Sequence, residues 1–522
     1  MEVLRTDVAI IGGGLGACAA ALGAARVGYR VVLTEETYWI GGQLTNQAVP
    51  PDEHPWIEEF GATASYKALR EGIRQYYRAH LPLTPVATAA KHLNPGNGWV
   101  SRLCHDPRVA VAVLHQMIAP YQLSGKMFVM HPHCPIDAWT HGDRVTGVVV
   151  RGLESGRDTL IEASYFIDAT PQGELLALAG VEHVLGAESR AETGEPHASE
   201  MADPKDQQAI TVCFAMEYLP GEDHTIDKPR QYELWRDYRP PDWPGRLLGW
   251  TTSRPETHEP LTRFLFEAED GRPWWHFRRI LDVTNFEHGF APSDVSVVNW
   301  PQNDYWFGPV CGVDEVEQAR NLEAARQLSL SLLYWLQTEA PRPDGGIGYR
   351  GLRLRRDVVG GTVDGLAPAP YIRESRRIRA EFTVLEQQIA HPLRPDGPEF
   401  FDDSVGIGCY RIDLHPRTSG AGYLDLGCWP FQIPLGSLLP VRVENLLPGG
   451  KNLGVTHITN GAYRVHHVEW NVGEAAGLLA AFCLERKVPP RFVRSRKALL
   501  EDFQSLLRRQ GIALSWPSLS PL

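Results

Sequence analysis

The stretch TDVAIIGGGLGACAAALGAARVG, residues 6–28, decides the fold. Residues 6–11 are mostly apolar and predict a short buried strand. Gly12, Gly14 and Ala17 follow directly and fit the pattern G-x-G-x-x-G/A, in which the glycines allow a tight turn and a close approach of phosphate, while a small third residue lets a helix lie close to the sheet. We therefore expect a dinucleotide to bind at a helix N-terminus, with contacts from Gly12, Gly14, Gly16 and Ala17.

The residues after this helix support the same interpretation. Gly28 is suited to end the helix, and YRVVLTEE, residues 29–36, predicts the second strand. Glu35 stands 21 positions after Gly14, where an acidic side chain accepts a hydrogen bond from a ribose hydroxyl. The alternative is a glycine cluster that only packs a helix against a strand.

The loop GGQLTNQAVPPDEHPW, residues 41–56, joins two glycines, a run of uncharged hydrogen-bonding side chains and two prolines. It resembles the glycine-pair loop of flavoproteins with two dinucleotide-binding folds, which crosses the isoalloxazine ring. The resemblance implies flavin contacts from Gly41, Gly42, Thr45 and Gln47. The alternative is a glycine turn followed by an ordinary polar loop.

A third segment continues the pattern. KMFVMHPHCPIDAWTHGDRVTGVVV, residues 126–150, predicts a strand pair joined at Gly142 and Asp143, and ASYFIDATPQGELLALAGV follows at residues 163–181. Flavoproteins of this type carry DATG where this chain has DATP, with Pro171 in place of the glycine. We assign Cys134 and Ala169 to the cofactor site.

The C-terminal stretch NLLPGGKNLGVTHITNGAYRVHHVEWNVGEAAGLLAAFCLER, residues 445–486, has a strand-like start, a glycine-rich loop and a helix from about Val468. In flavoproteins with two dinucleotide-binding folds, such a segment returns to the cofactor and directs a helix N-terminus at the flavin. Asn452, Asn471 and Val472 are the contacts expected here.

Five motifs together are specific: GGQLTNQAVPPDEHPW, NWPQNDY (299–305), PYIRESRRI (370–378), PFQIPLGSLLP (430–440) and GKNLGVTHITNGAYRVHHVEWNVGEAAG (450–477). The combination resembles the bacterial FAD-dependent oxidoreductase family that is sometimes mislabelled as xanthan lyase, and more distantly the fumarate reductase and succinate dehydrogenase flavoproteins. The resemblance covers nearly the whole chain and implies FAD. It implies an α/β flavoprotein with a glutathione-reductase-like Rossmann FAD domain, residues 1–180 plus 430–522, and an inserted α+β substrate or cap domain, residues 181–429.

Within the inserted part, the tryptophan-rich residues 211–300 favour an antiparallel sheet. Helical spacing is present in residues 314–341, which end at a proline, and a further helix is expected in RRIRAEFTVLEQQIA, residues 376–390.

Hydride transfer to a flavin needs a group that accepts the accompanying proton, and histidine suits this at neutral pH. The candidate catalytic residues are His457, His466 and His467, which flank the flavin-facing loop, and Arg464, because an arginine precedes the flavin helix in the fumarate reductase type. A structural, hydrogen-bonded histidine is an equally good interpretation of each one.

The substrate candidates are Arg373 and Arg376, together with His54 in the first flavin loop. A helical spacing in IRESRR would put Arg373 on one face with Arg376 or Arg377, where it could hold a carboxylate or sugar hydroxyls. Ion pairs with Glu374 or Glu381 are the favoured alternative.

Composition excludes several partners. The net charge of −12 and the pI near 5.9 argue against nucleic acid and anionic membranes. The apolar run at residues 8–25 is glycine-rich and is better explained by the dinucleotide helix than by a membrane span. The eight cysteines form no CxxC pair, so no metal motif is indicated and a reducing cytoplasm is expected. A homo-oligomer remains open.

The function expected is that of an FAD-dependent dehydrogenase or oxidase that moves a hydride from a polar small molecule to flavin N5. The electron acceptor stays open among oxygen, a quinone and another protein. Two alternatives remain: a flavin monooxygenase that uses NAD(P)H, and the polysaccharide lyase or hydrolase suggested by the inherited family label. A binding role without catalysis is the last possibility.

Overall fold

The computed structural model describes residues 1–241 and 243–522 and is built on a seven-stranded mixed sheet. The strands run in the order β3-β2-β1-β6-β5-β4, and β22 pairs with β6. Their bounds are β1 Glu2–Ile11, β2 Val31–Thr34, β3 Met127–Met130, β4 His133–His141, β5 Arg144–Gly152, β6 Asp158–Asp168 and β22 Leu446–Pro448. Strands β1, β2, β3, β6 and β22 are parallel, while β4 and β5 form the antiparallel edge. The predicted Rossmann-like α/β fold is confirmed.

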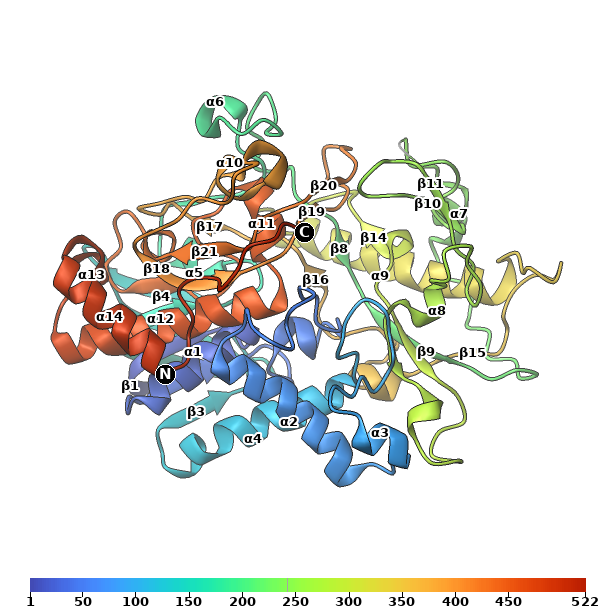
Figure 1. Ribbon diagram of the computed structural model, residues 1–522, viewed down its shortest axis with the longest axis horizontal. Coiled ribbons are helices and arrows are strands. Elements are labelled where there is room, and N and C mark those ends of the chain that lie inside the picture. The colour runs from blue at the N-terminus through green and yellow to red at the C-terminus, as the bar shows by residue number, and fades with distance from the viewer. Residues whose placement is uncertain (242) are drawn as a thin grey trace.

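Two helices far apart in the sequence pack against each other beside this sheet, α1 (Leu15–Arg26) and α12 (His466–Arg486). Figure 1 shows them side by side, blue against red. Their backbones touch where both carry small residues: a Cβ added to Gly473 would lie 2.0 Å from the Gly16 carbonyl oxygen, and one added to Gly477 would lie 2.2 Å from that of Ala20. The N-terminal and C-terminal segments thus form one unit.

The other helices surround this unit and the middle of the chain. They are α2 Ala64–His80, α3 Pro85–Ala89, α4 Pro107–Leu123, α5 Glu174–Leu178, α6 Arg190–Thr193, α7 Tyr232–Asp237, α8 Trp274–Phe277, α9 Glu315–Thr338, α10 Glu386–Ile389, α11 His457–Tyr463, α13 Pro490–Ser495 and α14 Lys497–Arg509, with short 3-10 turns η1 Gly42–Leu44, η2 Val283–Asn285, η3 Pro301–Asn303, η4 Arg356–Val359, η5 His391–Leu393 and η6 Leu435–Leu438. Helix α9 lies within residues 314–341, where the helical spacing of apolar residues predicted a helix.

The middle of the chain has its own core. A four-stranded antiparallel sheet, β12-β13-β9-β15, lies beside α9 on the right of Figure 1, and Trp274, Trp300 and Trp335 are buried between these elements. The strands outside the large sheet are β7 His183–Val184, β8 Ile210–Thr211, β9 Phe214–Tyr218, β10 Thr251–Ser253, β11 Pro260–Thr262, β12 Arg279–Leu281, β13 Val295–Val298, β14 Asp304–Tyr305, β15 Leu352–Leu354, β16 Tyr371–Ile372, β17 Arg377–Ile378, β18 Ser404–Gly408, β19 Ile412–Leu414, β20 Leu424–Leu426 and β21 Phe431–Pro434. The tryptophans are therefore core residues.

The prediction of a helix at residues 376–390 is wrong for most of that range. Only Glu386–Ile389 is helical, and Arg377–Ile378 forms strand β17 against β7. Pairing with a distant strand outweighs the local helical spacing, which is a weak preference. The helical spacing expected for the arginines of IRESRR is wrong for the same reason.

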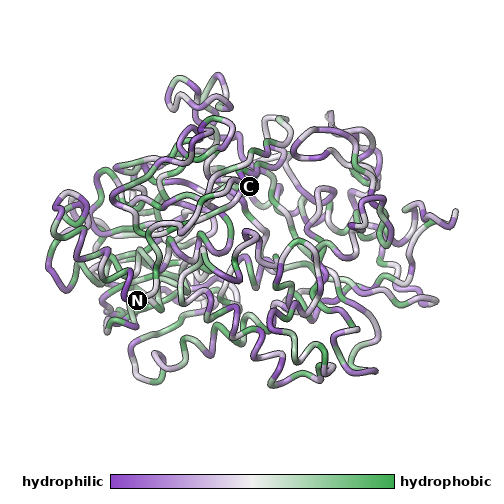
Figure 2. Tube along the Cα trace, viewed as in Figure 1, coloured by the Kyte–Doolittle hydropathy of each residue, from purple (hydrophilic) through white to green (hydrophobic). Residues whose placement is uncertain are grey.

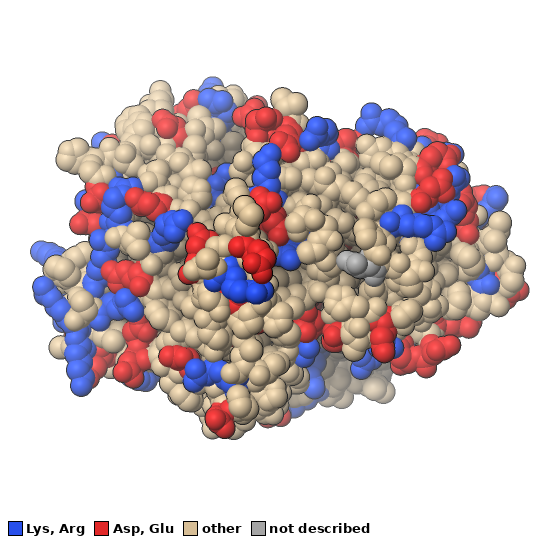
Figure 3. Space-filling model, turned by 90° about the horizontal axis from the view of Figure 1, so that it is seen from above, with Lys and Arg blue, Asp and Glu red and all other residues tan. Residues whose placement is uncertain are grey.

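Hydropathy follows the layers. The trace in Figure 2 is greenest where the central strands and α12 lie, and purple along many of the outer loops. On the face seen in Figure 3, acidic and basic side chains are interspersed.

Among the residues that the structure describes, no helix has both the length and the apolarity that crossing a bilayer requires.

Candidate cofactor and active site

The cofactor pocket lies where parallel strands end. Gly12 follows β1, Glu35 follows β2, Ala169 follows β6 and Gly450 comes shortly after β22, and all four line one pocket. Carboxyl ends of parallel strands meet at one edge of a sheet, which is where dinucleotides bind in this class of fold. The pocket is lined by Gly12, Gly14, Glu35, Glu36, Thr37, Gly42, Gln43, Asn46, Gln47, His133, Pro135, Ala169, Thr170, Pro171, Ala369, Gly450, Lys451, Asn452 and Glu469.

Glycine is required at the first turn. Gly12 has a φ of +96°, and a Cβ at this position would lie 2.4 Å from the carbonyl carbon of Ala169. Gly42, with a φ of +48°, would place a Cβ 2.9 Å from the Cα of Gly14. The three chain segments therefore approach one another backbone to backbone and leave the helix N-terminus open to a ligand.

Unpaired oxygens show that the pocket fits a hydroxyl-rich ligand. Within the described part of the chain, Gln43 Oε1, Asn46 Oδ1 and Gln47 Oε1 are buried and have no hydrogen-bond partner. Buried acceptors are seldom left unsatisfied, because that costs about 1–3 kcal/mol each. The ribityl and ribose hydroxyls and the flavin N3–H of FAD can donate hydrogen bonds to such oxygens, so the pocket fits this cofactor.

Glu35 stands at the pocket wall. Its carboxylate accepts hydrogen bonds from the Thr37 amide at 2.7 Å, the Thr37 hydroxyl at 2.8 Å and the Asn46 side-chain amide at 3.1 Å. Burial raises the pKa of Glu35 to about 7, against the lowering effect of these bonds. These bonds fix Glu35 at the pocket wall, and its predicted contact with a ribose hydroxyl stays a prediction.

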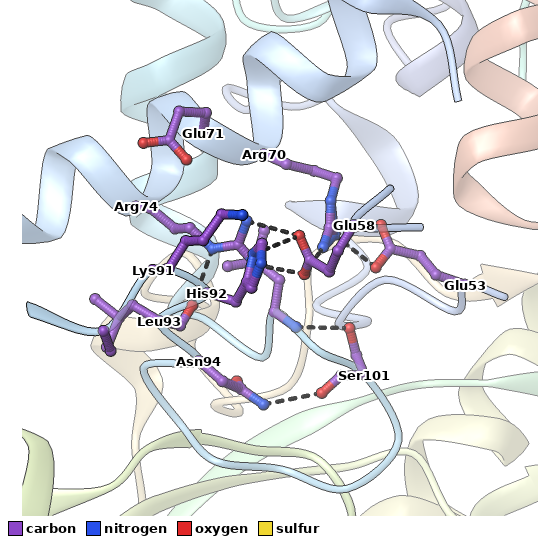
Figure 4. A network of polar contacts seen from close by, with 12 residues as sticks. Glu53, Glu58, Arg70, Glu71, Arg74, Lys91, His92, Leu93, Asn94 and Ser101 are labelled. Carbon is purple, nitrogen blue, oxygen red and sulfur yellow. Dashed lines mark hydrogen bonds and ion pairs between the residues drawn. The ribbon is translucent and has the colours of Figure 1, made fainter. Parts of the chain in front are cut away.

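The loop after β2 is held at both ends. The Gly41 amide donates to the Gly13 carbonyl oxygen at 2.7 Å, and the Thr45 hydroxyl donates to the Ile40 carbonyl oxygen at 2.8 Å. At the far end Arg70 binds Glu53 at 2.7 Å and also Glu58, which Arg74 contacts as well (Figure 4). These arginines come from α2, so that helix fixes the loop against the pocket.

The structure separates the expected cofactor residues into two groups. Those that line the pocket are Gly12, Gly14, Glu35, Gly42, Gln47, Ala169 and Asn452. Those that lie outside its lining are Gly16, Ala17, Gly41, Thr45, Cys134, Asn471 and Val472. Cys134 sits between His133 and Pro135, which do line the pocket, because side chains alternate along a strand. All of these assignments stay predictions.

Three charged residues of the pocket, Glu36, Lys451 and Glu469, were missed by the sequence analysis. Lys451 is 7% exposed, and burial lowers its pKa. Glu469, from the first turns of α12, accepts from the Gly16 amide at 3.3 Å and from the Gln43 side-chain amide, and burial raises its pKa. The position of Lys451 inside the glycine-rich loop GGKN was the signal that could have found it.

Two of the three histidines proposed as catalysts, His466 and His457, are held by contacts to the protein. His466 receives the Asp52 amide on Nδ1 at 3.1 Å and donates from Nε2 to the Val49 carbonyl oxygen at 3.1 Å. Burial lowers its pKa to about 4. His457 Nδ1 lies 2.9 Å from Glu374, and its Nε2 lies 3.2 Å from Arg417. These contacts leave both rings without a free nitrogen.

His467 and His54 form a buried pair of rings, with centroids 4.9 Å apart. Burial lowers the pKa of His54 to about 4 and that of His467 far below its ordinary value. His54 Nε2 contacts the Gly61 carbonyl oxygen at 3.2 Å, and its ring packs against Trp516. Within the described residues, His467 Nδ1 and Nε2 and His54 Nδ1 are buried without a hydrogen-bond partner, and the roles of both histidines stay predictions.

Arg464 occupies a buried polar centre next to the flavin loop. Its carbonyl oxygen accepts from the Gln43 side chain at 2.9 Å, its Nη1 donates to the Tyr371 hydroxyl at 2.7 Å, and its Nη2 lies 3.0 Å from Asp413. Its guanidinium therefore reaches a tyrosine and an aspartate while its backbone touches a side chain of the cofactor pocket.

The two substrate arginines differ. Arg373 is fully buried, pairs with Asp304 at 3.0 Å and lies over the Tyr371 ring at 4.9 Å. Arg376 instead donates to the Gln172 carbonyl oxygen at 3.0 Å. Of the three predicted arginines, Arg373 and Arg464 both contact Tyr371, whereas Arg376 contacts Gln172.

A further histidine, which was missed, completes this centre. His415 Nδ1 lies 2.5 Å from Asp304, and its Nε2 lies 3.6 Å from Asp413. About 19% of its side chain is exposed, unlike the predicted histidines. Because the carboxylate of Asp304 accepts a hydrogen bond from Nδ1–H, Nε2 is the nitrogen without a proton in the neutral ring. The segment DLHP, residues 413–416, places an aspartate two positions before this histidine and was the available signal.

Comparisons with known proteins agree with the cofactor. A search of curated proteins finds no match. Among solved structures, the chain is similar to an L-proline dehydrogenase from P. horikoshii (16% identity over 35% of this chain and 24% of that one, TM-score 0.19). It is also similar to a geranylgeranyl bacteriochlorophyll reductase-like protein from Thermoplasma acidophilum (11% identity over 98% of this chain and 85% of that one, TM-score 0.36). A third similar structure is quinol fumarate reductase from E. coli (12% identity over 98% of this chain and 74% of that one, TM-score 0.31).

The first of these matches spans only about a quarter of that protein's length. The family model described as FAD dependent oxidoreductase matches residues 7–507, nearly the whole chain. The protein is therefore an enzyme whose cofactor is FAD, and it belongs to the FAD-dependent oxidoreductase family.

Proposed function

We propose that this enzyme oxidises a polar small molecule at the centre formed by His415, Arg464 and Tyr371. The observation that supports it is the contact between Arg464 and Gln43, which links this centre to the cofactor pocket. FAD supplies the hydride acceptor when bound, so the protein has to orient the substrate and accept its proton.

His415 is suited to accept that proton. Its Nδ1 is held by the buried Asp304, which fixes the ring and stabilises the positive charge that forms when Nε2 is protonated. Arg373 pairs with the same aspartate at 3.0 Å and keeps its carboxyl ionised. Burial alone would raise the pKa of Asp304, but the charge of Arg373, together with hydrogen bonds from His415 and Thr211, outweighs burial and lowers that pKa.

Tyr371 and Arg464 are suited to orient the substrate. The Tyr371 hydroxyl accepts a hydrogen bond from Arg464, which leaves its own O–H to donate to a substrate oxygen. Asp413, 3.0 Å from Arg464, is partly exposed and can accept from a hydroxyl or ammonium group. A substrate with several hydroxyl or amino groups matches this set of donors and acceptors.

This proposal gives the middle of the chain its role as a substrate cap. His415 and Tyr371 come from residues 181–429, whereas Arg464 comes from the C-terminal segment. The substrate then lies at the junction of the two parts, and the oxidised cofactor is restored by an acceptor that stays open among oxygen, a quinone and a protein.

The test begins with the visible absorption spectrum of the purified protein before and after acid precipitation. Flavin in the supernatant indicates non-covalent FAD, and a yellow pellet indicates covalent attachment. The holoenzyme is then mixed anaerobically with a panel of alcohols, amines and sugars, and bleaching of the flavin band is expected with one class. If no member bleaches a flavin that dithionite reduces fully, the proposal fails.

A further inference from the structure

Lys451 is a buried cation whose ammonium group has no anionic partner in contact. It lies in the loop after β22 and lines the cofactor pocket, and among the residues described no hydrogen bond or ion pair to its ammonium group is found. Burying an ammonium group without a partner is costly, and proteins normally avoid it. The protein therefore provides this charge for a group that enters the pocket.

The position of Lys451 identifies the anion. The neighbouring Gly450 would place a Cβ 3.2 Å from Glu469, and Gly14, the N-cap of α1, would place one 3.1 Å from the same side chain. Lys451, Glu469 and the α1 N-terminus thus meet in one place. Gly14 gives α1 no side-chain cap, and the Gly16 amide of the first turn donates to Glu469 at 3.3 Å, so the other amides of this turn are available to an anion. The pyrophosphate is the anionic group of FAD.

Glu469 complicates this arrangement. Its carboxylate already takes the Gly16 amide at 3.3 Å. The pyrophosphate would bring about two negative charges beside it, in a pocket whose lining already includes Glu35 and Glu36. Among the described residues that line the pocket, Lys451 is the only lysine or arginine, so one positive charge faces several negative ones.

We propose that Lys451 pairs with the pyrophosphate of FAD and that Glu469 takes up a proton when FAD binds. The inference rests on the cofactor and is independent of the proposed substrate. The ionisable groups that act on Glu469 are Lys451 from the loop and Cys18 from α1. Glu35 acts in turn on Cys18, and Glu174 and Arg464 act on Lys451. The single nearby cation, Lys451, is too little to balance both the carboxylates and the added phosphates.

The direction of the pH dependence follows. Burial already raises the pKa of Glu469, and a neighbouring pyrophosphate raises it further. A group whose pKa rises on binding takes up a proton between its two pKa values. FAD affinity is therefore expected to fall as the pH rises through that window.

The first test compares the dissociation constants of FAD, ADP and FMN, from flavin fluorescence or calorimetry, in apoprotein carrying Lys451→Met or Lys451→Arg. We expect Lys451→Met to weaken FAD and ADP roughly 10- to 100-fold, with partial recovery in Lys451→Arg. Lys126→Met, at an exposed lysine, is the matched control and should bind like the parent protein. Loss of FMN affinity with unchanged ADP affinity would place Lys451 at the ring and overturn the assignment.

The second test measures proton uptake by calorimetry of FAD binding in two buffers that differ in ionisation enthalpy. The parent protein should take up protons, and Glu469→Gln should take up fewer and have an FAD affinity that depends less on pH. Equal uptake in both proteins would overturn the role of Glu469. If the variant does not fold, an affinity of the parent protein that does not change with pH overturns that role equally. Failure of the parent protein to bind FAD at all would instead contradict the cofactor.

Discussion

The contact between α1 and α12 gives the sharpest test of the fold. Gly473→Ala would put a Cβ 2.0 Å from the Gly16 carbonyl oxygen, whereas real contacts stay above 3.0 Å. The helices must then separate by about 1 Å, the difference between these two distances. Overpacking of this kind typically costs about 1–3 kcal/mol, and a backbone-to-backbone contact belongs at the upper end because neither side can rotate away. The separation also displaces Gly16, whose amide donates to Glu469, a residue that lines the cofactor pocket.

We therefore expect Gly473→Ala to lower the melting temperature by several degrees and to weaken FAD binding, as measured by thermal unfolding with and without the cofactor. Gly477→Ala, which meets Ala20 at 2.2 Å farther from the pocket, should lower stability with less effect on FAD. Gly245→Ala is the matched control, because nothing lies within 4 Å of its added Cβ. Unchanged stability of Gly473→Ala relative to this control would refute the close helix contact.

Three further predictions concern charged groups. Arg70→Met should destabilise the protein by about 3–5 kcal/mol in denaturant unfolding and release FAD, because it leaves the buried Glu53 unpaired beside the flavin loop; unchanged FAD retention would contradict this. Glu58→Gln should cost roughly 1–2 kcal/mol at pH 7, because Arg74 and Arg70 outweigh burial and lower the pKa of Glu58 to about 2 while solvent screens part of the interaction, and the deficit should shrink as the pH falls from about 4.5 toward 2, where Glu58 itself is protonated. His415→Asn should keep FAD and its reduction by dithionite but slow substrate-dependent bleaching by roughly 100-fold or more; bleaching at the parent rate would exclude His415 as the base.

The dinucleotide unit could be predicted because its signals are local. The glycines at 12 and 14 and the acid at 35 are read from spacing along one segment, and the fold brings Gly12, Gly14 and Glu35 to the same pocket. The helix at 376–390 could not be predicted correctly, because the pairing of β17 with β7 depends on a segment almost two hundred positions away in the sequence. Local spacing carries no information about such a partner.

The histidines show where sequence reasoning about the site ends. His466 is a candidate because it flanks the C-terminal glycine-rich loop, but its two nitrogens are occupied by backbone groups of the other loop, residues 41–56, and burial keeps it neutral. His415 lies outside the motifs and gains its basic Nε2 from Asp304, which is 111 positions away. The chemistry of an imidazole is set by the partner of its other nitrogen, and tertiary structure supplies that partner. Residues that line a pocket follow from the local backbone, whereas residues that move protons depend on contacts that only the folded chain makes.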